Sequence, residues 1–239
     1  MSIADKALDA LMKPASDVLL KLLGPAAQET GQMLGDIVRV YRLGRSVKLL
    51  NKVKRLAEEA GFEPRAVPVR LLLPILEVAS LEQDEDLHTM WANLLANAAN
   101  PSTDPDLTGW PAFLEVLKQL SPYEARFLER LYGRALRYGR AIFQQEFYLG
   151  TDQDLAAYTG DPIEAHVSGG WMKLHLLLDN VERLGIVARR RRIARFESPT
   201  NPEPDYYLTA FGYRFLLACR QSSEVAPAGI RNAEEGSRG

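Results

Sequence analysis

The residues that could carry out chemistry are few and widely separated in this chain. The histidines are His88, His166 and His175, and the single cysteine is Cys219. No two histidines stand at the spacing of three or four residues that places two metal ligands on one helix face. The acidic cluster Glu82–Asp86 lacks the glycine turn and the spaced ligands of a calcium-binding loop. We therefore expect no metal site, no cofactor and no catalytic residue, and we expect that the protein is not an enzyme.

The composition favours a cytoplasmic globular protein. Hydrophobic residues make up 46% of the chain and charged residues 25%, and the net charge of −2 argues against a generally basic nucleic-acid coat protein. A lone cysteine permits no intramolecular disulfide and suits a reducing compartment. Asp5 and Asp9 interrupt the N-terminus where a signal peptide needs an apolar core. Peripheral contact with the inner membrane is an alternative location, because the basic stretch 39–55 has apolar residues at the spacing of an amphipathic helix.

An arginine-rich segment is the first feature that could bind a partner. Five of the seven residues from Arg189 to Arg195 are arginine. Side chains of an extended strand alternate between two faces, so guanidinium groups would lie on both faces. Such groups suit phosphate contacts, which dominate nonspecific affinity for nucleic acid. The candidate nucleic-acid-binding residues are Lys173, His175, Arg189, Arg190, Arg191, Arg192 and Arg195. The alternative is a charged edge hairpin that resists aggregation.

A basic stretch from Arg39 to Arg55 is the second such feature. It holds seven Lys or Arg and no acid, and apolar residues recur within it at spacings of three and four. A basic amphipathic helix can lie on an anionic membrane or on a partner. The alternative is a surface helix whose bases face water or the acidic region 63–106. The candidate membrane- or partner-binding residues are Arg39, Arg42, Arg45, Lys48, Lys52 and, further along the chain, Trp91.

The segment Ser80–Pro101 predicts a well-defined helix. Ser80 and Gln83 fit a capping box, and the acids that follow complement the helix dipole. Leu87, Trp91, Leu94 and Ala98 then share one face. Trp91 is either an anchor in an interface or a core residue. Asn93, Asn97 and Asn100 line another side of the helix, where they could hydrogen-bond a partner or a neighbouring helix.

The pattern along the whole chain predicts a mainly α protein. Residues 1–140 read as a helical bundle, with two short helices or one kinked helix around Pro14 and a short helix broken near Pro74. Residues 141–220 read as a small winged-helix-like α+β unit with one β-hairpin, and residues 221–239 as a disordered tail. Further helices are predicted at Pro25–Tyr41, Asp152–Tyr158 and from Asp161. Glycine caps are predicted at Gly61 and Gly185, and a helix start at Ser121 to Glu124.

Four segments of the sequence resemble motifs of one bacterial family. They are the acidic segment with the MWANLLANAANP motif that follows it, Phe113–Ser121, Asp179–Gly185 and Leu208–Gly212. These segments are similar to the Abi-alpha family, which is linked to abortive infection against phage. The resemblance implies a helical defence protein, and it brings no catalytic residues. A protein partner or a phage component is then the expected binding partner, acting without enzymatic chemistry. A regulator that binds DNA or RNA through the C-terminal unit is the alternative, and the oligomeric state is not indicated.

Overall fold

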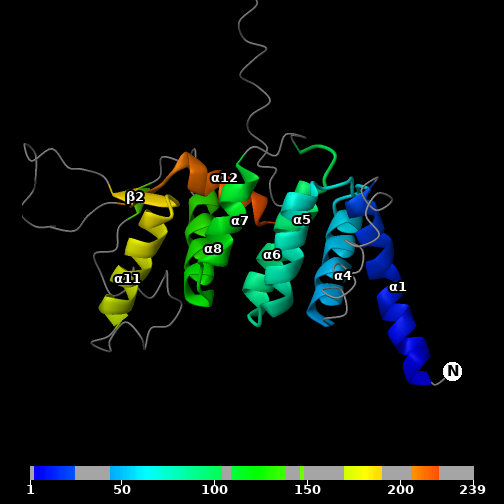
Figure 1. Ribbon diagram of the computed structural model, residues 1–239. Coiled ribbons are helices and arrows are strands. Elements are labelled where there is room, and N and C mark those ends of the chain that lie inside the picture. The colour runs from blue at the N-terminus through cyan, green and yellow to red at the C-terminus, as the bar shows by residue number, and fades with distance from the viewer. Residues whose placement is uncertain are drawn as a thin grey trace, which may run out of the picture. The chain divides into compact units, whose positions relative to one another are not determined.

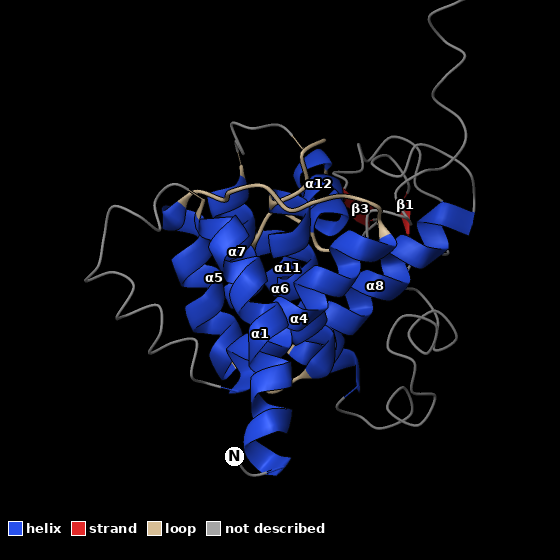
Figure 2. Cartoon of the chain, turned by 90° about the vertical axis from the view of Figure 1, so that its right-hand side faces the viewer, coloured by secondary structure: helices blue, strands red, loops and turns tan. Residues whose placement is uncertain are grey.

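A computed structural model describes residues 3–24, 44–103, 109–137, 146–147, 170–189 and 206–220 (Figure 1). Within these ranges the chain forms eight helices and three short strands, so the predicted mainly α class is confirmed (Figure 2). The helices are α1 (Ile3–Leu23), α4 (Gly44–Glu59), α5 (Val69–Leu81), α6 (Glu85–Ala98), α7 (Trp110–Lys118), α8 (Pro122–Arg137), α11 (Gly170–Arg183) and α12 (Ala210–Ala218). The strands are β1 (Glu146–Phe147), β2 (Val187–Arg189) and β3 (Tyr206–Leu208). The helices predicted at 25–41, at 152–158 and from 161 lie outside the described residues.

The described residues fall into two compact units. The first unit holds the residues up to Leu114 together with those from Leu217 onward, and the second holds Glu115 to Leu216. The boundary therefore lies at residue 114, whereas the sequence pattern placed it at 140. The last turn of α12 also belongs to the first unit. Within the second unit, the amide of Asn180 in α11 donates to the carboxylate of Glu124 in α8.

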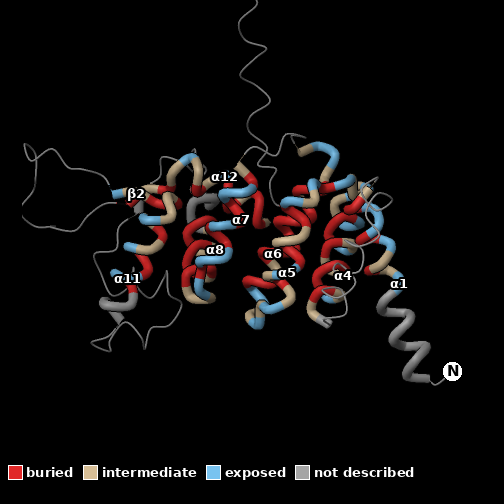
Figure 3. The backbone as a smooth tube through the Cα atoms, in the orientation of Figure 1, coloured by how far each residue is buried: buried red, intermediate tan, exposed pale blue. Residues whose placement is uncertain are grey.

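The first unit is organised around α4. This helix packs against α1 as well as against α5 and α6, and Figure 1 shows it between α1 and α6. Leu49, Leu50 and Val53 are completely buried on its inner side, and Leu50 and Val53 belong to the apolar stripe that the sequence predicts. Figure 3 shows the buried stretches of α4, α5 and α6 in red. The apolar side of α4 is thus covered by other helices of its own unit.

Two prolines lie inside helices without ending them. α1 runs as one helix from Ile3 to Leu23 through Pro14. α5 runs unbroken from Val69 to Leu81, so the predicted break near Pro74 is wrong. A proline inside a helix costs about 3 kcal/mol. Burial of apolar side chains on both sides of Pro74 offsets this cost, at roughly 1.5–3 kcal/mol for each large side chain. The buried residues of α5 are Leu71, Leu72, Ile75, Leu76 and Ala79.

The start of α6 differs from the predicted capping box at Ser80 and Gln83. Ser80 lies in the last turn of α5, and its hydroxyl donates to the carbonyl of Glu77. α6 begins four residues later than predicted, where the carboxylate of Asp84 accepts hydrogen bonds from the backbone N–H groups of Asp86 and Leu87. Ser and Asp are almost equally good N-caps. Continuation of α5 over Ser80 therefore leaves Asp84 as the residue that caps α6.

The glycine caps predicted at Gly61 and Gly185 are confirmed. Gly61 has φ of 72° and Gly185 has φ of 74°, a region that favours glycine. After α4, the N–H of Phe62 donates to the carbonyl of Ala57, and after α11 the N–H of Ile186 donates in the same way to Val181. These bonds are the 6→1 hydrogen bonds of a Schellman motif. Both helices therefore end where the sequence places a glycine.

The second unit combines α8, α11 and a small antiparallel sheet. The sheet has the order β1-β3-β2, with Val187 opposite Leu208 and Glu146 opposite Tyr207. Antiparallel pairing of β2 with β3 agrees with the predicted hairpin, whereas β1 is an additional strand that the sequence pattern did not predict. The chain between β1 and α11 lies outside the described residues, so the winged-helix assignment stays a prediction.

Candidate functional site

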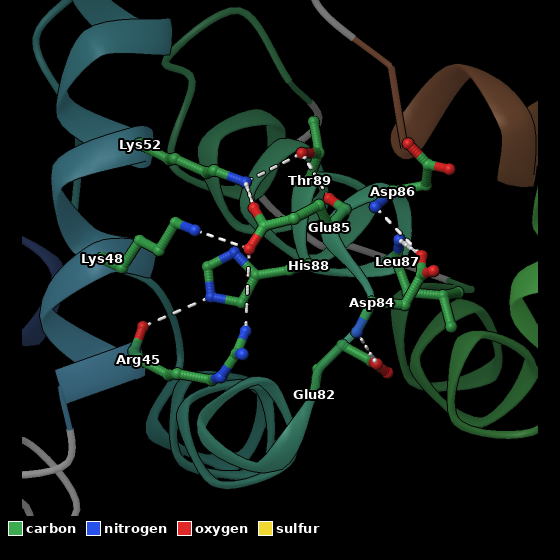
Figure 4. Close-up of polar contacts among 10 residues, drawn as sticks. All are labelled: Arg45, Lys48, Lys52, Glu82, Asp84, Glu85, Asp86, Leu87, His88 and Thr89. Carbon is green, nitrogen blue, oxygen red and sulfur yellow. Dashed lines mark hydrogen bonds and ion pairs between the residues drawn. The ribbon is translucent and has the colours of Figure 1, made fainter.

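A polar cluster joins α4 to the first turn of α6 in the first unit. Arg45, Lys48 and Lys52 stand three and four residues apart, so they share one face of α4. All three are directed at Glu85, the first residue of α6 (Figure 4). The Nζ atom of Lys48 lies 2.5 Å from Oε1 of Glu85, Nζ of Lys52 lies 3.3 Å from Oε2, and Nη1 of Arg45 lies 3.7 Å from Oε1. We call these four residues the Glu85 cluster.

The lysines keep Glu85 ionised. Hydrogen bonds from Lys48 and then from Lys52 lower the pKa of Glu85 from 4.5 to about 2. Lys52 also donates to the hydroxyl of Thr89, one turn further along α6. Exposed ion pairs of this kind contribute little to stability. The cluster therefore matters more as an arrangement of charge on the surface than as a source of stability.

A buried histidine lies directly behind the Glu85 cluster. His88 is completely buried, and its Nε2 lies 3.3 Å from the backbone carbonyl of Arg45 in the first turn of α4. Because a carbonyl oxygen can only accept, Nε2 carries the proton and donates. The other ring nitrogen, Nδ1, has no hydrogen-bond partner among the described residues. Burial, assisted by the charge of Lys52, lowers the pKa of His88. The ring is thus held neutral at the junction of the two helices.

The remaining polar face of α6 reaches the end of α12. The side-chain amide of Asn93 donates to the carbonyl of Cys219 at 3.1 Å. The amide of Asn97 donates to the carbonyls of Ala218 at 2.9 Å and Arg220 at 2.7 Å. The last carbonyls of a helix have no partner within that helix, so these amides act as a C-terminal cap supplied by another element. We call Asn93 and Asn97 the α6 amide pair. The sequence left open whether these asparagines hydrogen-bond a binding partner or a neighbouring helix. The structure shows Asn93 and Asn97 bonded to the neighbouring helix.

Trp91 lies in the core of the first unit. Only 1% of its surface is exposed, which favours the core interpretation over an anchor in an interface. Of the other residues expected to bind a membrane or a partner, Arg45, Lys48 and Lys52 are brought together by the structure around Glu85. Arg39 and Arg42 lie outside the described residues. The apolar side of α4 is buried, so a membrane-lying α4 would first have to leave the bundle.

The arginine-rich segment is described only at its first residue. Arg189 pairs with Asp179 and with Glu182 of α11, the latter at 2.7 Å, and its guanidinium lies 5.4 Å from the ring centre of Tyr206. Its charge is therefore balanced within the second unit. Lys173 and the exposed His175 both lie on α11. Arg190, Arg191, Arg192 and Arg195 lie outside the described residues, so the nucleic-acid interface stays a prediction.

Throughout the described ranges, no group of three or more His, Cys, Asp or Glu side chains is arranged to hold a metal ion. Within the same part of the chain, no helix combines the length and the apolar character needed to cross a membrane.

The Glu85 cluster, His88 and the α6 amide pair all fall inside one matched region. The family model for abortive infection alpha matches residues 44–219, which is most of the chain. The chain belongs to the abortive infection alpha (Abi_alpha) family. No curated protein and no solved structure matches it significantly. The Abi_alpha region begins at the first residue of α4 and ends just after α12. The α6 amide pair therefore connects the middle of this region to its end.

Sequence reasoning did not assign a role to Glu85 or His88. The sequence pattern indicates only that Glu85 is one acid of a solvated helix start, and that His88 is a surface or partly buried polar residue. Their partners on α4 lie 33 to 43 positions away, so no local sequence pattern could predict the pairing. One signal was available, because the excess of bases in 39–55 is complemented by the excess of acids in 63–106.

Proposed function

We propose that this protein is a phage-defence protein of the abortive-infection type, and that it acts by binding a macromolecular partner rather than by catalysis. Membership of the Abi_alpha family supports the defence role. The proposed binding surface is the exposed part of the Glu85 cluster, on α4 and the start of α6. The expected partner is a protein or a phage component that presents anionic groups to this surface.

The observation that carries the proposed surface is the imbalance of charge within the Glu85 cluster. Three cations converge on a single carboxylate, which cannot neutralise all of them. The side chains of Arg45 and Lys48 are 38% and 47% exposed, whereas that of Lys52 is only 15% exposed. Arg45 and Lys48 thus combine a fixed position with access to solvent. Guanidinium and ammonium groups held in this way suit charge-assisted hydrogen bonds to anionic groups.

The test is protection of a bacterial host against a panel of phages. We compare cells that express the wild-type chain with cells that express Arg45→Gln combined with Lys48→Gln. Both changes remove a positive charge from the proposed surface and leave the buried side of α4 intact. We expect the wild type to reduce plaque formation by at least one phage and the double variant to lose that protection.

A matched control lies on the same helix. Lys54 and Arg55 are also cations of α4, but each pairs with an acid one turn later, Glu58 and Glu59 respectively. Lys54→Gln combined with Arg55→Gln makes the same change in net charge and should keep protection. Equal loss in both double variants would contradict the proposed surface. Absence of protection by the wild type across the panel would contradict the defence role itself.

A further inference from the structure

The junction between α4 and α6 contains a buried titratable group that the proposed function does not use. His88 has no exposed surface, and among the described residues its ring makes one hydrogen bond, from Nε2 to the carbonyl of Arg45. In Figure 4 its ring lies between the backbone of Arg45 and the side chains of Lys48 and Lys52. Every other bond that the ring could form would have to use Nδ1, which has no partner in the part of the chain that the structure describes.

The surroundings of the ring oppose a second proton. From α4 it faces the positive charges of Arg45, Lys48 and Lys52, and from α6 it faces the single negative charge of Glu85. α5 also packs on α6, and its charged residues Arg70 and Glu77 are exposed to solvent. Glu85 is already engaged by the cations of α4, and among the described residues neither of its oxygens accepts a hydrogen bond from Nδ1. A protonated ring would therefore place a charge and an unsatisfied donor in a buried site.

We propose that His88 is a proton-operated latch, and that protonation of its ring separates the first turn of α4 from α6. A protonated ring needs water or an acceptor at Nδ1, and it can reach water only when α4 moves away. The hydrogen bond that is lost is the one to the carbonyl of Arg45, so the opening begins at the N-terminal end of α4. Arg45 and Lys48 move with this turn, and Glu85 remains on α6. The chemical ligand of the latch is the proton alone.

The direction of the pH effect follows from the difference between the closed and the open state. In the open state the ring is hydrated and has an ordinary pKa of about 6.5. In the closed state burial and the nearby cations lower the pKa of His88, so the ring stays neutral. At pH 6.5 and above, protonation therefore raises the equilibrium constant for opening by no more than about twofold. Below that value the equilibrium constant for opening rises by up to tenfold for each pH unit. Glu85 does not titrate in this window, because its pKa is about 2.

The latch would act as a trigger for the proposed binding surface, and in that role it rests on the proposed function. The opening itself can be tested without any assumption about function. The test is amide hydrogen exchange of the purified full chain between about pH 7.5 and about pH 5, with rates corrected for intrinsic exchange. We expect protection in the first two turns of α4 to fall by about fivefold between about pH 6.5 and about pH 5.5, and by a further factor of up to about ten over the next pH unit. Protection in α5 and α8 should remain constant.

The decisive variant is His88→Gln, because glutamine can still donate to the carbonyl of Arg45 and cannot titrate. We expect protection of α4 in this variant to be independent of pH. His175→Gln, which changes an exposed histidine of α11, should behave as the wild type. If His88→Gln does not fold, NMR titration of the His88 ring in the wild-type chain decides the question. A ring midpoint at or above 6.5 would overturn the latch, as would pH-independent protection of α4 in the wild type or equal loss over all helices.

The two proposals fail in different experiments. Loss of phage protection in the Arg45→Gln and Lys48→Gln variant depends on the charges of the surface and is measured in cells. The pH dependence of exchange depends on His88 and is measured on the purified chain. A latch that opens as expected, together with phage protection that does not depend on Arg45 and Lys48, would leave the latch intact and reject the proposed surface.

Discussion

The two units of the protein treat a buried polar side chain in opposite ways. In the second unit, the buried carboxylate of Glu124 has partners at both oxygens: Oε1 accepts from the amide of Asn180, and Oε2 accepts from the backbone N–H and the hydroxyl of Ser121. In the first unit, the completely buried ring of His88 has a partner at only one nitrogen among the described residues. A fully satisfied group fixes its neighbours, whereas a partly satisfied group can respond to a change in its protonation state. The comparison thus separates a rigid junction from one that responds to acid.

The largest expected effect on stability comes from removing the carboxylate of Glu124. Glu124→Ala leaves the N–H of Ser121 and the amide of Asn180 without their charged acceptor, and hydrogen bonds to charged groups are worth about 1.5–3 kcal/mol each. We expect the free energy of unfolding to fall by about 3 kcal/mol, measured by urea denaturation. Glu115→Ala is the control, since Glu115 is exposed and pairs with Lys118, and should cost less than about 0.5 kcal/mol. If both variants lost the same free energy of unfolding, the carboxylate of Glu124 would not hold its unit together in the way that the comparison assumes.

A smaller effect distinguishes the two serines that the sequence presents as helix caps. Ser121 caps α8, with its hydroxyl accepting from the N–H of Glu124, whereas Ser80 lies inside α5. We expect Ser121→Ala to lower the free energy of unfolding by about 1 kcal/mol. Ser80→Ala should change it by less than about 0.5 kcal/mol, because alanine is well tolerated within a helix. A costly Ser80→Ala substitution would instead support a helix that begins at Ser80.

The smallest effect concerns Glu85 and sharpens the assignment of the acid response to His88. Because the pKa of Glu85 is lowered from 4.5 to about 2 in the folded chain, its contribution to stability is complete above pH 4.5 and is lost as the pH falls towards 2. We expect the difference in Tm between wild type and Glu85→Gln to be constant above about pH 5 and to shrink below pH 4.5. Added salt should also reduce it. If the difference in Tm changes between about pH 5 and about pH 7, part of the acid response in that range comes from Glu85 and not from His88.

Features determined by neighbouring residues were predicted well from the sequence. The helix start at Ser121, the glycine ends of α4 and α11 and the buried stripe of α4 each depend on residues three or four positions apart. The start of α6 failed for a related reason, because Ser80 and Asp84 are both good caps and only the packing of α5 chooses between them. The continuation of α5 through Pro74 likewise depends on burial against other helices, which local rules do not include.

The candidate site was predicted in part. Arg45, Lys48 and Lys52 were among the candidate binding residues, and the structure brings these three side chains together around Glu85. The spacing could not show that Glu85 lies opposite them or that His88 lies behind Glu85. Those pairings connect α4 with α6 across the fold, and they depend on how the two helices pack. The arginines after Arg189 lie outside the described residues, so their predicted contact with nucleic acid stays untested.

The α6 amide pair has a consequence for synthesis of the chain on the ribosome. Asn93 and its acceptor Cys219 are separated by 126 positions, and the whole of the second unit lies between them in the sequence. Contacts between distant positions form late, because a long loop must close first. A growing polypeptide must therefore expose the polar edge of α6 to solvent until the final helix has emerged. Release of a chain that stops before Leu217 would leave these amides permanently without their acceptors.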